Sequence, residues 1–145
     1  MTPFGKLTLK EKESLLKLPV YISLLAGSGE GILDEAEKKA ALNFANVKSF
    51  SCHTTLKDFY REVDRTFENN LELINAELPK EKAEREAAIR KEQVRLQRLV
   101  LKLGRQYAAR LQKSMKSFSE HVHKAHHSVM MDFILPLQIP GLTDR

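Results

Sequence analysis

The chain has 145 residues and a formal net charge of +5, and its length is typical of a single domain. It contains 42% hydrophobic and 30% charged residues, no Trp, six Gly and five Pro, a composition that favours an all-α protein over a turn-rich β protein. Its one cysteine, Cys52, excludes an internal disulfide and a zinc site built from cysteines. The first residues lack the apolar core of a signal peptide, and no segment reaches the ~20 apolar residues of a membrane-spanning helix. We therefore expect a cytoplasmic protein without a transmembrane segment.

The charges are segregated along the chain. Residues 80–116 contain twelve Lys and Arg and four Glu, a net charge of +8, which leaves a net charge of −3 for the rest. This uneven distribution predicts a basic surface on one part of the domain.

The first predicted helix begins at a capping box. Thr8 and Glu11 form the T-x-x-E pattern, in which each side chain accepts a hydrogen bond from a backbone N–H that the helix start leaves unpaired. The residues from 15 to 25 are so densely apolar that we expect this helix to be covered on most sides. Pro19 either kinks the helix at Leu18 or opens a new helix there.

The second predicted helix follows a glycine-rich turn, residues 27–31, which ends the apolar segment. Asp34 suits the N-cap position, and Glu35 and Glu37 lie in the first turn, where the helix dipole favours anions. We expect this helix to end near Asn46. The residues predicted on its buried face are Ala36, Ala40, Ala41, Phe44 and Val47.

A third, amphipathic helix is predicted after a connector at residues 48–53, with Thr54 or Thr55 as its cap and an end near Pro79. Apolar residues recur at steps of three and four along it, which indicates a single buried stripe. The residues of this stripe are Phe59, Tyr60, Val63, Phe67, Leu71, Ile74 and Leu78.

Residues 80–129 contain no proline and one glycine, so they form either one very long helix or two. In a compact domain we expect a break, either at Gly104 or within residues 113–119. Residues 80–91 have almost no large apolar side chain, so they project into solvent or form the charged start of the helix.

The tail, residues 130–145, is apolar but interrupted by prolines. It is either an extended strap packed into a groove or an exposed patch for a protein partner. The residues of that patch would be Phe133, Ile134, Leu135 and Leu137.

Residues 30–37, EGILDEAE, fit the pattern acidic-Gly-x-apolar-Asp-x-x-Glu. This pattern, with the apolar helix before it, resembles the TerB-like family associated with tellurite resistance, over roughly residues 7–74. The resemblance implies a compact helical fold and a cytoplasmic, non-enzymatic module acting in a stress response. It also implies that Glu30, Asp34 and Glu37 are the ligands of a divalent cation.

The chemistry of the acidic turn is compatible with calcium or magnesium, because hard cations bind several oxygen ligands. Asp34 and Glu37 lie three residues apart on one helix face, and Glu30 would reach back from the turn. Backbone carbonyls and water would have to supply the remaining ligands. The alternative is that Asp34 is an N-cap and the glutamates complement the helix dipole, with no metal bound.

Two further groups of residues are candidate sites. The run His121, His123, His126, His127 contains an i, i+4 pair that could share a metal, or it is a surface run of imidazoles. A row of basic residues at steps of four, three, four and three follows one side of the predicted helix. Such a row could contact phosphates, but it has no stacking aromatics, so we favour pairing with the acidic half of the domain or a protein partner over nucleic acid. The row consists of Lys91, Arg95, Arg98, Lys102 and Arg105.

We predict one all-α domain, residues 1–145, formed by a compact bundle of five to seven helices. Residues 7–78 would form the TerB-like helices and residues 80–129 the long basic segment. No nucleophile motif surrounds Ser23, Ser28 or Cys52, so we do not expect an enzyme. The predicted function is binding of a divalent cation; the alternative is an interaction module that binds a protein, or weakly a nucleic acid, with no metal site.

Overall fold

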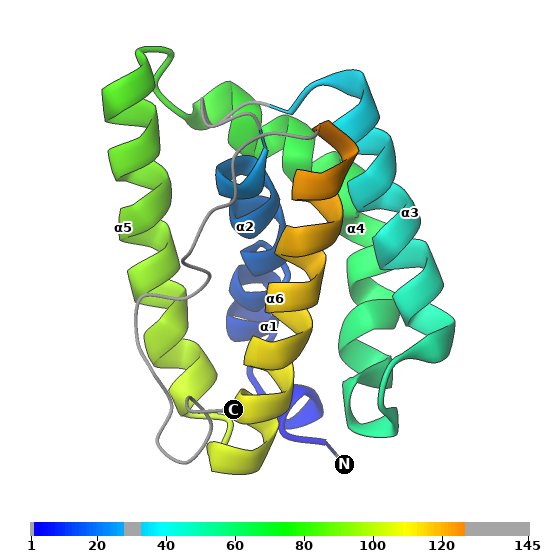
Figure 1. The fold of residues 1–145 in the computed structure, drawn as a ribbon. Helices are drawn as coiled ribbons and strands as arrows, with labels where there is room; N and C mark the ends of the chain where they lie inside the picture. Colours follow the sequence, from blue (N-terminus) through cyan, green and yellow to red (C-terminus); the bar gives the residue numbers. More distant parts are fainter. Residues whose placement is uncertain (1, 28–32, 127–145) are drawn as a thin grey trace.

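In the computed structural model of the protein, the described residues are 2–27 and 33–126, and this part of the chain folds as an all-α bundle without strands (Figure 1). The predicted fold class is confirmed. None of the helices in these two ranges is long and apolar enough to cross a membrane. In chain order the elements are η1 (Phe4–Lys6), α1 (Leu9–Leu15), α2 (Leu18–Ala26), α3 (Glu35–Ser51), η2 (Thr54–Leu56), α4 (Lys57–Glu77), α5 (Lys82–Leu101) and α6 (Arg105–His126), where η marks a 3-10 helix.

Helix α2 is the centre of the bundle. All its residues are buried, and it packs against α4, α5 and α6. Pro19 lies in the first turn of α2, where its missing N–H breaks no helical hydrogen bond and its fixed φ suits the helix. Of the two alternatives for this proline, the structure therefore shows the opening of a new helix.

Helices α3 and α4 pack against each other, and α3 also packs against α6. The predicted α4 stripe is confirmed from Phe59 to Ile74, and all six of its residues in the helix are buried. Helix α3 is longer than predicted, because it ends at Ser51 rather than near Asn46.

The buried face of α3 differs in part from the prediction. Ala36 and Val47 are exposed, whereas Ala41 and Ala45 are buried. The buried residues of α3 are Glu37, Ala41, Ala45 and Ser49, spaced four apart along one line. This line of mostly small side chains allows α3 to pack against α4 and α6, and the larger Leu42 and Phe44 beside it are partly buried against the core.

Thr54 and Thr55 do not cap α4, because both belong to η2. The side chain of His53 caps this short helix instead, and its Nδ1 accepts the backbone N–H of Thr55 at 3.1 Å.

The helical segment is interrupted between α5 and α6 at Gly104, which is one of the two positions predicted for a break. Gly104 has φ of 96°, a backbone conformation that other residues rarely adopt. Residues 82–91 form the charged start of α5 rather than a projection into solvent, and Arg85 within them is buried.

Candidate functional site

The acidic turn lies only in part within the described residues. Asp34 Oδ1 accepts the Glu37 N–H at 2.7 Å, and Glu37 Oε1 accepts the Asp34 N–H at 2.9 Å, which is a complete capping box. Glu30 lies outside the described residues. Within residues 2–27 and 33–126, no three His, Cys, Asp or Glu side chains form a group that could hold a metal ion. The cation site at Glu30, Asp34 and Glu37 therefore stays a prediction, and the role that the geometry shows for Asp34 and Glu37 is capping of α3.

Of the histidine run, only the side chains of His121 and His123 lie within the described residues. The ring of His121 lies 5.0 Å from the ring of Phe44 on α3. His123 is buried, and its Nδ1 has no hydrogen-bond partner in the described structure. His127 and the side chain of His126 lie outside it. A metal shared by His123 and His127 stays a prediction.

Two hollows lie side by side along α5 and share Arg95. The first, about 330 Å³, lies between the start of α1 and the second half of α5. Its lining includes Thr8, Lys10, Glu11 and Ser14 from one side and Arg95, Arg98, Leu99 and Lys102 from α5. The second, about 410 Å³, lies between α2, the end of α4 and α5. Its lining includes Lys17, Tyr21, Glu77, Lys91, Glu92 and Arg95, with Ile74, Leu78, Pro79 and Ala88 as apolar surface. We call these two hollows together the basic groove.

The charge of the basic groove is unbalanced. Six cationic side chains line it, and the carboxylates among its lining residues are those of Glu11, Glu77 and Glu92. Two of the cations are paired: Arg95 donates to Glu92 at 2.9 Å, and Lys102 to Glu11 at 2.8 Å. The other four form no ion pair with any described residue. These unpaired cations are Lys10, Lys17, Lys91 and Arg98.

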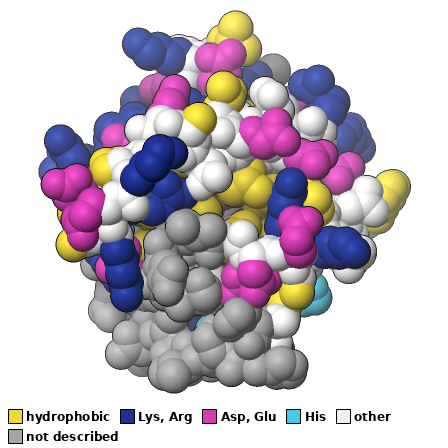
Figure 2. All heavy atoms as spheres, turned by 90° about the horizontal axis from the view of Figure 1, so that it is seen from above, with side chains coloured by type: hydrophobic (Ala, Val, Ile, Leu, Met, Phe, Trp, Pro, Cys, Tyr) yellow, Lys and Arg dark blue, Asp and Glu magenta, His cyan; other side chains and the backbone are white. Residues whose placement is uncertain are grey.

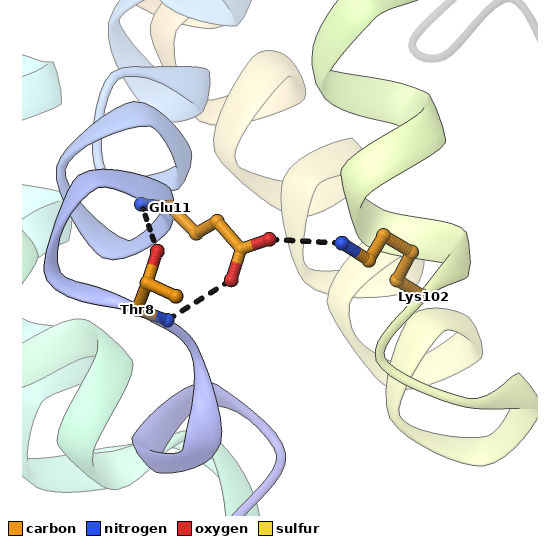
Figure 3. A network of polar contacts seen from close by, with 3 residues as sticks. All are labelled: Thr8, Glu11 and Lys102. Atoms are coloured by element: carbon orange, nitrogen blue, oxygen red, sulfur yellow. Dashed lines mark hydrogen bonds and ion pairs between the residues drawn. The ribbon is translucent and has the colours of Figure 1, made fainter.

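One polar network ties the two walls of the groove together (Figure 3). Thr8 Oγ1 accepts the Glu11 N–H at 3.1 Å, and Glu11 Oε1 accepts the Thr8 N–H at 2.9 Å, so the predicted capping box is present. The second carboxylate oxygen of Glu11 accepts Lys102 Nζ at 2.8 Å. The hydrogen bond from Lys102, followed by that from the Thr8 backbone, lowers the pKa of the Glu11 carboxyl. The Glu11 side chain thus joins the capping box of α1 to the C-terminal end of α5.

Tyr21 gives the second hollow a neutral polar group. Burial raises the pKa of its phenol to about 12, because the charged form would lose its hydration, so the hydroxyl stays protonated at neutral pH. With the apolar surface beside it, this hollow suits a side chain that is only partly polar.

Charge is distributed differently at the end of the bundle seen in Figure 2. Lys, Arg, Asp and Glu side chains are interleaved there, around patches of hydrophobic surface. The basic groove differs from this end of the bundle in the balance of its lining residues, which are six cations and three carboxylates.

Sequence reasoning found one wall of this groove and missed the other. Of the five residues in the predicted basic row, four line the groove, and Arg105 does not because it starts α6. Lys10 on α1 and Lys17, the N-cap of α2, were missed because only the fold brings α1 and α2 beside α5. Their spacing of seven residues, two helical turns, is the one signal that could have suggested a second basic row.

Comparisons with protein-family models, with curated protein sequences and with solved structures gave no match to this chain. The TerB-like resemblance therefore stays a prediction that rests on residues 30–37 and the helix before them.

Proposed function

We propose that this protein is a non-enzymatic helical module that binds an acidic segment of a partner protein in the basic groove. The observation that carries the proposal is that four cations without an ion pair to any described residue line the basic groove from both of its walls: Lys10, Lys17, Lys91 and Arg98. Surface cations are ordinarily mixed with carboxylates, and an unbalanced set along a groove attracts a ligand of opposite charge.

A peptide suits this groove better than a nucleic acid. Glu11, Glu77 and Glu92 lie among the cations and would repel a continuous row of phosphates, whereas a peptide can place uncharged residues opposite them. The first hollow has no aromatic side chain on which a base could stack. The apolar surface of the second hollow matches a hydrophobic side chain, which an acidic peptide can supply next to its carboxylates.

The dimensions of the groove set the length of the segment. Lys91 on α5 and Lys102, the C-cap of α5, are eleven residues apart, which corresponds to about 16 Å along the helix axis. A segment of about five extended residues or about three helical turns covers this distance. Arg98 lies between the two lysines, and its guanidinium can donate two parallel hydrogen bonds to one carboxylate.

Fluorescence anisotropy with a short labelled peptide of Glu, Asp and Leu tests the proposal. We expect binding that weakens as salt is raised, and a loss of about tenfold or more in affinity when Arg98→Glu and Lys10→Glu are combined. The matched control combines Lys39→Glu on α3 and Arg61→Glu on α4, two exposed cations outside the groove that give the same change in net charge.

Two results would contradict the proposal. An equal loss in the control variant would mean that the peptide responds only to overall charge. Tighter, salt-sensitive binding of a single-stranded RNA of the same length would mean that the groove takes a nucleic acid instead of a peptide.

A further inference from the structure

The first hollow already contains a carboxylate in the position that a ligand would take. Glu11 is the one acidic residue among its lining residues, and its Oε2 lies 2.8 Å from Lys102 Nζ. The Lys102 side chain is 65% exposed, so it is accessible to a ligand from solvent. The Glu11–Lys102 pair therefore reproduces, within the chain, the contact expected between the groove and a partner.

We infer that Glu11 is an internal competitor, which occupies Lys102 until a carboxylate of the partner displaces it and so lowers the affinity of the basic groove for weakly acidic ligands. The inference rests on the proposed function, because it assumes that the groove binds an acidic segment. It assigns to Glu11, an anionic residue, a role in determining which ligands the basic groove binds.

The geometry explains why Glu11 can compete. Its Oε1 is held by the Thr8 N–H, so the carboxylate is already fixed in place by the helix cap and loses little further freedom in pairing with Lys102 (Figure 3). A ligand must therefore displace an ordered group rather than a freely moving one.

The pair is also weak enough to exchange. It lies at the surface, where an ion pair is screened by water and salt. A partner that brings several carboxylates gains contacts to the unpaired Lys10 and Arg98 at the same time, whereas a ligand with one carboxylate would only replace Glu11. The groove would thus select segments with clustered acidic residues.

The variant Glu11→Gln tests this inference without removing the helix cap, because glutamine also serves at this position of a capping box. We expect it to bind the peptide of Glu, Asp and Leu about two- to fivefold more tightly than the wild type, the range expected for removal of an exposed ion pair. Glu13→Gln is the matched control: it lies on the same helix, makes the same charge change and lines neither hollow.

A double-mutant cycle with Lys102→Gln gives a second readout. Because Glu11 already occupies Lys102 in the wild type, Lys102→Gln alone should weaken peptide binding less than it does in the Glu11→Gln background. A role of Glu11 in helix capping alone would produce no such coupling. Thermal melts of each variant establish that all four proteins of the cycle are folded.

The outcomes separate this inference from the proposed function. An equal gain in Glu11→Gln and Glu13→Gln, or no gain in Glu11→Gln, would overturn the role of Glu11, while a loss in the Arg98→Glu and Lys10→Glu variant would still support the groove. If no variant binds the peptide at low salt, the groove proposal fails and the role of Glu11 fails with it.

Discussion

Helices α4 and α5 have nearly equal lengths, 21 and 20 residues, but their buried faces are of different chemistry. The buried residues of α4 are all aromatic or aliphatic. Their one polar side-chain group is the hydroxyl of Tyr60, which is hydrogen-bonded to Ser114 at 2.5 Å. The buried residues of α5 include Arg85, Gln93 and Gln97. Since burial of apolar surface is the main stabilising term, α4 is built to hold the bundle together. Helix α5 contributes less to the core and carries Lys91, Arg95 and Arg98 of the basic groove outside its buried face.

The largest effect expected from this contrast is the loss of stability when a cavity is made in the α4 stripe. Phe67 is fully buried, and its ring stacks against that of Phe118 on α6 at 5.8 Å. Phe67→Ala should lower the free energy of unfolding by about 3–5 kcal/mol, measured by urea denaturation. Phe50→Ala is the control, because Phe50 is 73% exposed and should cost less than about 0.5 kcal/mol. Similar losses in both variants would contradict the assigned core.

An intermediate effect is expected at the cap of α3. Asp34→Ala removes the acceptor of the Glu37 N–H and should lower the free energy of unfolding by about 1 kcal/mol, more than the exposed Glu35→Ala in the same helical turn. The same melts with and without calcium or magnesium test the predicted cation site, because a cation bound only to the folded state raises its stability. A rise in the wild type that Asp34→Ala abolishes would favour the site; no rise with either metal would leave the cap as the role of the turn.

On the α5 side, one substitution should stabilise the protein. Gln97 is fully buried, and neither polar atom of its amide has a hydrogen-bond partner in the described structure. Gln97→Met keeps the shape of the side chain and removes the unpaired amide, so it should raise the free energy of unfolding by about 1 kcal/mol in urea denaturation. A loss of stability would mean that the Gln97 amide forms hydrogen bonds in the folded protein. Polar contacts would then fix α5 in the bundle, contrary to the contrast with α4.

The smallest effect is a pH dependence of the link between α1 and α5. The pKa of Glu11 is lowered in the folded protein, so its contribution to stability is fully present above the ordinary carboxyl pKa and is lost as the pH falls through the lowered value. The difference in urea midpoint between wild type and Glu11→Gln should therefore be seen at neutral pH and disappear in acid. A difference that persists below the lowered pKa would contradict the ion pair with Lys102.

The same contrast explains what could be predicted from the sequence. The α4 stripe, the caps at Thr8 and Asp34 and the break at Gly104 depend on residues close together in the chain, and each is confirmed. The buried face of α3 depends on which helices it contacts, and Val47 was placed wrongly for that reason. The basic groove depends on α1 and α2 lying beside α5, so the four basic residues of α5 and its C-cap were found and Lys10 and Lys17 were not.

The central claim is that the basic groove along α5 binds an acidic segment, and chemical-shift mapping by NMR tests it most directly. On titration of the labelled protein with the peptide of Glu, Asp and Leu, backbone amides of Lys10, Glu11 and Ser14 on α1 and of Arg95 to Lys102 on α5 should shift first and most. Amides of α3, which lies across the bundle from α5, should not move (Figure 1). Shifts spread over all basic surfaces, or confined to α3 and α4, would contradict the claim.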